Sequence, residues 1–247
     1  MVFWRCFAAS SLITGLVYGC GNGAYLSTEN TRQVVQEINV SQLLTEVKTN
    51  KKAEDLFKQG NNLLDRQRYQ DSIAAYDKAI ALNSESADAW INRGIALTKL
   101  QKNTEAIASY DKAIAIKADK DEAWYNRGNA LTSLQRYSEA IAAYDQAIAI
   151  KPDKHEAWIN RGIALTKLQR YQEALASYDK AISIKPDKAE AYYNRACTYA
   201  LQGKAELAIK NLKAAIQLVP DKFQKLARTD SDFKKVRGDW RFQELIQ

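Results

Sequence analysis

The chain contains few of the residues that build turns, disulfides and metal sites. Its 247 residues include only 10 Gly, 3 Pro, 3 Cys and 1 His. So few Gly and Pro leave little material for the tight turns of an all-β fold, and they favour helices. Three cysteines are too few for disulfides to hold together a fold of this size. The one histidine, His155, has no cysteine near it in sequence with which to form a zinc site. The composition therefore predicts a helical protein without a metal or any other cofactor.

The positive net charge does not follow the pattern of a nucleic-acid surface. The chain carries 36 Lys+Arg against 29 Asp+Glu, a net charge of +7. More than half of this excess lies after residue 200, and acidic and basic residues alternate along residues 51–200. Alternation is typical of solvated helix faces, whereas a phosphate backbone is bound by a basic stripe. We expect no nucleic-acid partner.

The first twenty residues resemble an export signal. A mostly apolar stretch from Cys6 to Tyr18 is too short to span a bilayer comfortably, and it fits the apolar region of a secretory signal with Arg5 as its basic residue. Val17–Cys20 resembles a bacterial lipobox, in which the Cys is lipidated after cleavage, although Tyr18 departs from that pattern. We expect a signal peptide over residues 1–20, lipidation of Cys20 and a location in the cell envelope. An uncleaved signal anchor or a buried apolar N-terminus is the alternative.

Several residue types recur at a spacing of 34 along the chain. The prolines stand at 152, 186 and 220, and three of the five tryptophans stand at 90, 124 and 158. Two further columns hold glycine and tyrosine: Gly60, Gly94, Gly128 and Gly162, and Tyr76, Tyr110, Tyr144 and Tyr178. Such self-similarity indicates stacked units, none of which can bury its apolar face alone.

Each unit reads as two helices. In residues 121–154, apolar residues recur at helical spacing on both sides of a break at Gln135 and Arg136. We expect Trp124 to fill the space beside the small Gly128, where two helix axes approach closely. Pro152 should end the second helix.

The residues of this unit resemble the tetratricopeptide repeat family. The positions that carry the resemblance are Trp124, Gly128, Tyr137, Ala140, Tyr144, Ala147 and Pro152. The resemblance implies an all-α fold, a right-handed α-solenoid of five repeats: 53–86, 87–120, 121–154, 155–188 and 189–222. Residues 21–52 would form a linker or leading segment, and residues 223–247 a C-terminal cap like that of many bacterial proteins of this type.

The two ends of the solenoid are less regular. Val40, Leu43, Leu44 and Val47 fit a helical pattern, but nearby β-branched residues leave residues 31–50 open between helix, strand and linker. In the cap, Ser231 or Asp232 should cap one short helix and Asp239 another. We expect an apolar face that covers repeat five, formed by Phe233, Val236, Trp240, Phe242, Leu245 and Ile246.

The resemblance also implies a concave groove lined by the first helix of each repeat. Numbering each repeat from 1, position 2 is acidic in all five repeats, position 5 is apolar or aromatic, and position 6 is Asn in four. An Asn carboxamide both donates and accepts, so a row of them can hold the backbone of an extended peptide. The predicted peptide-binding residues are Asn92, Asn126, Asn160, Asn194, Tyr125, Tyr193, Glu122, Glu156 and Asn129.

Other readings of these columns remain open. The Asn side chains could instead bond to a neighbouring turn of the protein. The carboxylate clamp that the family uses for chaperone tails is disfavoured, because Phe57 stands where it needs a Lys. An Arg column at position 7 and an Asp column at position 25 predict ion pairs between helices. We interpret Cys197 as a small packed hydrophobe, not a nucleophile.

The sequence therefore predicts a protein that is not an enzyme. It would be an interaction scaffold that binds extended protein segments in the groove. Two alternatives stay open: an assembly or chaperone-like factor for a membrane or envelope complex, and the regulatory subunit of a separate enzyme.

Overall fold

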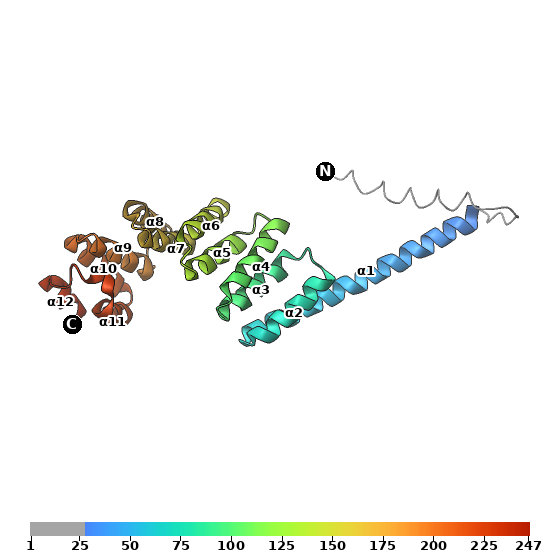
Figure 1. Cartoon of the computed structure of the whole chain (residues 1–247), viewed down its shortest axis with the longest axis horizontal. Coiled ribbons are helices and arrows are strands. Elements are labelled where there is room, and N and C mark those ends of the chain that lie inside the picture. Colours follow the sequence, from blue (N-terminus) through green and yellow to red (C-terminus); the bar gives the residue numbers. More distant parts are fainter. Residues whose placement is uncertain (1–27) are drawn as a thin grey trace. The chain divides into compact units, whose positions relative to one another are not determined.

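The computed structural model describes the backbone of residues 28–247 and their side chains from Asn39 onward. The predicted signal segment and Cys20 lie outside the described residues. The chain divides after Lys48 into two units, each of which is considered by itself. Every regular element of residues 28–247 is a helix, which confirms the all-α prediction (Figure 1).

The second unit is a stack of helical hairpins. In repeats two to five the first helix packs against the second, and the second helix of each of repeats one to four packs against the first helix of the next repeat. The paired helices of repeats two to five are α3 Ala87–Lys99 and α4 Asn103–Ile116, α5 Asp121–Ser133 and α6 Tyr137–Ile150, α7 His155–Lys167 and α8 Tyr171–Ile184, and α9 Ala189–Leu201 and α10 Ala205–Leu218. Repeat one is formed by the end of α1 Thr28–Asp65 and by α2 Tyr69–Leu82. Two helices per 34 residues is the solenoid that the period predicts.

The break between the two helices of a repeat is a left-handed turn. In repeat three Gln135 has φ of 59°, its N–H donates to Thr132 O at 2.9 Å, and Arg136 N–H donates to Leu131 O at 2.9 Å. These two bonds satisfy carbonyls at the end of α5 and reverse the chain. Gln stands at the same place in repeats one to four, at positions 67, 101, 135 and 169, and Gly203 replaces it in repeat five.

Within each of repeats one to four, the glycine of the Gly column packs directly against the ring of the Tyr column. A Cβ at Gly128 would lie 2.5 Å from Cε1 of Tyr144, whose side chain is fully buried, and the same holds for the three equivalent pairs. Trp124 was therefore the wrong residue to place beside Gly128. The Trp124 indole is partly buried and donates to Ala118 O at 2.9 Å, so it holds the loop that precedes its helix.

The predicted ion pairs join successive repeats. Arg93 Nε lies 2.6 Å from Asp77 Oδ1, and Arg127 Nε lies 2.7 Å from Asp111 Oδ1. The pairs Arg161 with Asp145 and Arg195 with Asp179 repeat the arrangement. Since each Arg reaches back 16 residues to the second helix of the preceding repeat, the column fastens one repeat to the next.

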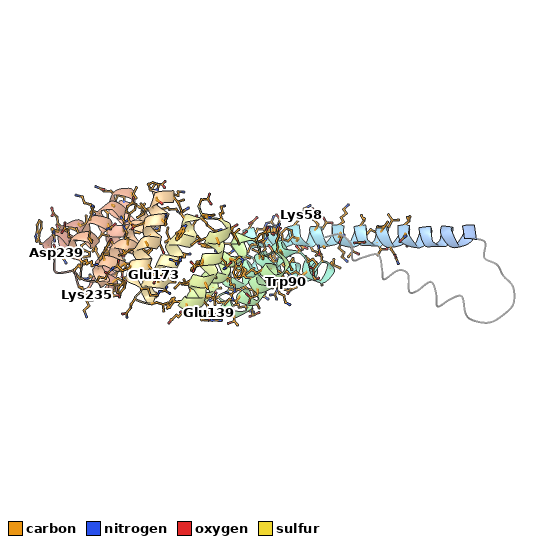
Figure 2. The ribbon with its side chains drawn as sticks, turned by 90° about the horizontal axis from the view of Figure 1, so that it is seen from above. Lys58, Trp90, Glu139, Glu173, Lys235 and Asp239 are labelled. Carbon is orange, nitrogen blue, oxygen red and sulfur yellow. The ribbon has the colours of Figure 1, made fainter. Side chains whose placement is uncertain are left out.

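A second set of ion pairs marks where second helices begin. Arg136 pairs with Glu139 at 2.6 Å at the start of α6, and Arg170 pairs with Glu173 at 2.7 Å at the start of α8. Both glutamates, which Figure 2 labels, have side chains that are about half exposed. A carboxylate in the first turn also suits the positive end of the helix dipole.

The C-terminal segment covers repeat five. It consists of α11 Pro220–Thr229, the 3₁₀ turn η2 Ser231–Phe233 and α12 Trp240–Ile246. Phe223, Phe233, Val236, Phe242 and Ile246 are buried in one cluster with residues of α9 and α10, and Leu245 packs against it. This agrees with the predicted apolar face, but the Trp240 side chain is 72% exposed and was wrongly included.

Of the two helix caps predicted in this segment, the one for α12 is confirmed and the one for η2 is wrong. Asp239 caps α12 by accepting from Arg241 N–H. Asp230, not Ser231 or Asp232, caps η2 by accepting from Asp232 N–H. Asp230 takes this role because its extended backbone aims its carboxylate back at the turn, as an N-cap requires.

The leading segment is helical. Residues 28–48 of α1 form the described part of the first unit, so the helical pattern prevails over the β-branched residues. Val40, Leu43, Leu44 and Val47 are 51–63% exposed along this helix. No helix within residues 28–247 combines the length and the hydropathy that a membrane crossing would need.

Candidate functional site

The candidate site is the row of first helices, and its Asn column divides into two kinds. Asn92 Nδ2 donates to Asn61 Oδ1 at 2.9 Å, and Asn160 Nδ2 donates to Asn129 Oδ1 at 2.8 Å. In each case the acceptor also receives a tyrosine hydroxyl, from Tyr76 at 2.8 Å and from Tyr144 at 2.9 Å. These two Asn side chains thus join neighbouring repeats.

The other two Asn side chains lack this partner. The residue that lies 31 positions before Asn92 and Asn160 is Asn, but the residue 31 positions before Asn126 is Ile95, and before Asn194 it is Ile163. Asn194 instead donates to Glu190 O at 2.8 Å. The Asn126 side chain makes no hydrogen bond to any described residue, so its amide is available to a ligand.

The two candidate tyrosines differ in their surroundings. Tyr125 is partly buried, its hydroxyl accepts from Asn160 Nδ2 at 3.2 Å, and Lys154 Nζ lies 4.7 Å from the centre of its ring. Tyr193 is 7% exposed and packs on Phe223 and Phe233. Its hydroxyl donates to Asp230 at 2.7 Å, so Tyr193 supports the cap and we leave it out of the site.

The acidic row is also partly used within the chain. Asp88 accepts from Lys120 at 2.7 Å, and Glu190 accepts from Lys222 at 2.7 Å. The hydrogen bond from Lys222 lowers the pKa of the Glu190 carboxyl. Glu156 lies 3.3 Å from His155. Because burial lowers the pKa of His155, this contact is not an ion pair at neutral pH. Among residues 39–247, Glu122 and Glu156 are therefore the members of this row without an ion pair.

A cavity opens beside Asn129 and Asn160. Its volume is about 240 Å³, and it is lined by Asn129, Thr132 and Ser133 of α5, Tyr144 of α6, and Asn160 and Ile163 of α7. Burial raises the pKa of the Tyr144 phenol, so Tyr144 stays a neutral donor in the wall. The lining thus offers amide and hydroxyl groups with one apolar side chain, which suits a peptide backbone and a small side chain.

One cluster was not foreseen from the sequence. Cys197, Asp230 and Asp232 bring three potential ligand atoms within 4.8 Å of one another. Burial, followed by the neighbouring carboxylates, raises the pKa of the Cys197 thiol well above its usual range. A thiol held protonated is not an activated nucleophile, and Cys197 is buried in the hydrophobic cluster of α9 and α10, which agrees with the packing role predicted for it.

Comparison with known proteins identifies the repeat. The sequence profile of the tetratricopeptide repeat family matches residues 57–122, 114–155 and 125–189, and a second profile with the same description matches residues 177–210. A search of curated proteins gave no match.

Solved structures share the fold. YrrB, described as a tetratricopeptide repeat protein with an unusual peptide-binding site, is 25% identical, with a TM-score of 0.63 over 77% of this chain and 97% of YrrB. PilW, described as a type IV pilus biogenesis factor, is 23% identical, with a TM-score of 0.68 over 78% of this chain and 90% of PilW. MamA from Desulfovibrio magneticus RS-1 is 17% identical, with a TM-score of 0.64 over 68% of this chain and 94% of MamA.

These matches agree with the stacked helix pairs described above. Because the family profile covers more than half of the sequence, the chain belongs to the tetratricopeptide repeat family.

Proposed function

We propose that the chain is a non-enzymatic scaffold that binds extended protein segments along its first helices, centred on α5. The observation that carries the proposal is the available amide of Asn126, on the helix that lines the cavity beside Asn129. Equivalent amides in the neighbouring repeats are engaged within the chain. The peptide-binding site named for YrrB, a protein of the same fold, supports a peptide as the class of ligand.

One face of α5, partly buried at Asn126 and Asn129, carries the groups that such a ligand needs. Glu122, Asn126, Asn129 and Ser133 follow one another at three- and four-residue spacing, so they lie along one side of the helix. The Asn126 amide both donates to a carbonyl and accepts from an N–H, so it suits the backbone of any extended segment. Glu122 adds a carboxylate for a basic side chain of that segment.

The Asn126 amide is tested by comparing two alanine variants with peptides selected on the wild-type chain from a displayed random library. Asn126→Ala should weaken every selected peptide by about 1–3 kcal/mol, because a peptide group loses its partner, and should leave protein stability unchanged. Asn92→Ala is the matched control. It should lower the free energy of unfolding by about 1 kcal/mol, because Asn61 loses a donor. Calorimetric titration showing that Asn126→Ala binds the peptides as tightly as wild type would remove α5 from the site.

Glu122 makes a separable prediction. Glu122→Gln should weaken peptides that carry Lys or Arg and should reduce the salt dependence of their binding, since an exposed ion pair is screened by salt. Neutral peptides should bind the variant and the wild type alike. Titration of both peptide classes at two ionic strengths distinguishes this role from that of Asn126.

A second candidate function is assembly of a membrane or envelope complex. The description of PilW as a pilus biogenesis factor favours it, together with the export-signal pattern of residues 1–20. We propose that the chain is exported and tethered by a lipid on Cys20. Cys20→Ser should then move the protein from the membrane fraction to the soluble fraction and remove the mass of the lipid. An unchanged mass and an unchanged membrane fraction would exclude Cys20 as the anchor.

A further inference from the structure

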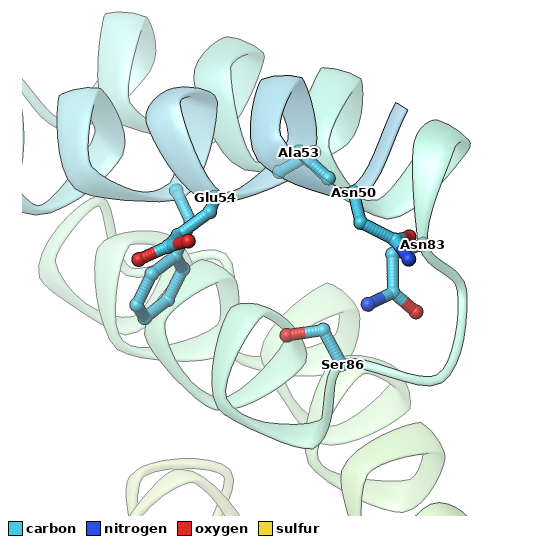
Figure 3. Close-up of a pocket in the computed structure, with 7 residues that line it drawn as sticks. Asn50, Ala53, Glu54, Asn83 and Ser86 are labelled. Carbon is cyan, nitrogen blue, oxygen red and sulfur yellow. The ribbon is translucent and has the colours of Figure 1, made fainter. Parts of the chain in front are cut away.

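A second cavity lies at the first repeat, between α1, the end of α2 and the start of α3. Its volume is about 270 Å³, and its lining includes Asn50, Ala53, Glu54, Phe57, Asn83 and Ser86. Figure 3 shows Glu54 at one end of the cavity and the amides of Asn50 and Asn83 at the other. Pockets for drug-sized molecules usually measure about 300–1,000 Å³. This cavity is therefore suited to one side chain of a partner.

In three later repeats the corresponding place is filled by a lysine of the chain itself. The last residue of the repeat reaches an acidic residue at position 1 or 2 of the same repeat. Lys120 Nζ lies 2.7 Å from Asp88, Lys154 Nζ lies 2.7 Å from Asp121, and Lys222 Nζ lies 2.7 Å from Glu190. In repeat one the last residue is Ser86, whose short side chain reaches no carboxylate and leaves the cavity open.

Repeat one also has the kinds of side chain that contact these lysines in the later repeats, an acid and an aromatic ring. Glu54 stands at position 2, and Phe57 stands at position 5, where Tyr125 lies beneath Lys154 Nζ at 4.7 Å in repeat three. An aromatic face attracts a cation, and the hydrocarbon stem of a lysine packs on apolar surface. Within the described part of the chain, the side chain of Asn50 has no hydrogen-bond partner, so its amide oxygen is a further acceptor.

The Glu54 carboxylate is available even though Lys58 contacts it. The two side chains lie 2.7 Å apart, and each is 62% exposed. Lys58 lowers the pKa of the Glu54 carboxyl, which is therefore charged at neutral pH. An exposed pair of this kind contributes little to stability, and a carboxylate has two oxygens with which to accept. A second ammonium can therefore bind Glu54 beside Lys58 or in its place.

We propose that the cavity of repeat one binds a lysine side chain of the partner segment, with its ammonium on Glu54 and its stem against Phe57. This inference rests on the proposed scaffold function and names one residue that the bound segment contains. Lysine is favoured over arginine because the chain fills the equivalent places of repeats two, three and five with lysine. The partner would thus supply to repeat one the lysine side chain that repeats two, three and five take from their own last residue.

The direct test uses Nα-acetyl-lysine N-methylamide as the probe and the side-chain amide signals of Asn50 and Asn83 as the readout. Saturable shifts in the millimolar range are expected with this probe and not with its norleucine analogue, which lacks the ammonium. Glu54→Gln should weaken the probe by about 3- to 10-fold.

Ser86→Lys supplies the sharpest variant, because it gives repeat one the lysine that other repeats have. It should abolish probe binding while the protein stays folded, since Lys already precedes α5, α7 and α9. Ser86→Ala is the matched control: it removes the same hydroxyl without filling the cavity, and it should keep the probe. Signals of Asn50 and Asn83 that do not respond to the lysine probe, or that respond equally in Ser86→Lys, overturn the proposal.

Selected peptides separate this proposal from the scaffold function. Peptides selected on the wild-type chain should be enriched in Lys at one position, and those selected on Ser86→Lys should lose this enrichment. Peptides that bind through Asn126 while the lysine probe fails would leave the scaffold function standing and exclude the lysine pocket. If the lysine probe binds at Glu54 but Asn126→Ala does not weaken the peptides, the lysine pocket stands and the site on α5 is excluded.

Discussion

Gly128 has no room for a methyl group, although it lies within a helix where alanine is preferred. The added Cβ would lie 2.5 Å from the Tyr144 ring, which is buried and held through its hydroxyl by Asn129 and Thr132. Overpacking costs about 1–3 kcal/mol, and the helix propensity of alanine returns at most about 1 kcal/mol. Gly128→Ala should therefore lower the free energy of unfolding in urea. Gly238→Ala, where a Cβ would have no atom within 4 Å, should change it little.

Asp232 predicts a pH dependence of stability. Burial, followed by the charge of Asp230, raises the pKa of the Asp232 carboxyl in the folded chain above its unfolded value of about 3.9. The folded state then binds the proton more tightly, so this contribution is complete below the unfolded pKa and is lost as the pH rises through the folded pKa. Asp232→Asn should be more stable than wild type at neutral pH, with the difference vanishing near pH ~3.

Asp239 gives the matched control of opposite sign. Its hydrogen bonds to Arg241 lower its pKa, so it stabilises the folded chain above its unfolded pKa and loses this effect as the pH falls through the folded pKa. Asp239→Asn should reduce stability at neutral pH, although Asn is itself a good N-cap. Thermal unfolding from acid to neutral pH tests both variants. Parallel curves for Asp232→Asn and wild type would contradict the assigned pKa shift.

Residues that recur every 34 positions are equivalent between repeats, but the recurrence does not show which of them are in contact. The Gly and Tyr columns were visible, yet the sequence pointed to Trp124 rather than Tyr144 as the neighbour of Gly128, because the pairing depends on how two helices cross. The same limit applied to the Asn row. Whether an Asn of this row is engaged depends on whether position 9 of the preceding repeat is Asn or Ile. This pattern is present in the sequence, but it could be recognised only once the contact between repeats was known.

At the scale of the element, the left-handed turn between helices is a site of stored strain. Gln135 adopts φ of 59°, a conformation that costs a residue with a Cβ about 1 kcal/mol, whereas Gly203 takes the equivalent place in repeat five with φ of 73°. Gln135→Gly should raise the free energy of unfolding by about 0.5 kcal/mol, after the greater freedom of glycine in the unfolded chain is subtracted. Gly203→Gln should lower it. Equal midpoints for Gln135→Gly and wild type would show that the turn is unstrained.

Helix boundaries within the repeats could be predicted because five copies report the same break. The ends of the chain are single copies, and the sequence was ambiguous there. Residues 31–50 contain Val34, Val35 and Ile38, whose β-branched side chains favour strands locally, and continuity with the first repeat outweighs this preference. In the cap, Asp230, Ser231 and Asp232 are all good capping residues, and the sequence alone does not show which one has the extended backbone.

At the scale of the molecule, the solenoid needs its C-terminal cover. Phe223, Phe233 and Phe242 are each no more than 2% exposed, and they bury the open face of repeat five. Deleting residues 223–247 should expose this apolar surface and cause self-association, measured by light scattering after gel filtration. Trp240→Ala alters the same segment at a side chain that is 72% exposed and should remain monomeric. A soluble monomer after the deletion would contradict the role of the cap.

The groove was the least predictable level, since its chemistry depends on which side chains remain unengaged after packing. The Lys at the end of repeats two and five pairs with an acid of the position-2 row that the sequence placed in the groove, and the Lys at the end of repeat three pairs with an acid at position 1. Ser86 in the same column was the signal for the open cavity in repeat one, but it is informative only once the Lys contacts are known.

The Arg and Asp columns also bear on how repeat number can change in evolution. Each Arg reaches back 16 residues, so excision of residues 121–154 would bring Arg161 to the same distance from Asp111 as Arg127 has now. The architecture would survive such a recombination, yet Asn160 would then follow Ile95 instead of Asn129 and would become available to a ligand. Loss of this repeat would thus replace the available amide of Asn126 with that of Asn160 and exchange the side chains around it, while the ion pairs between repeats stay the same.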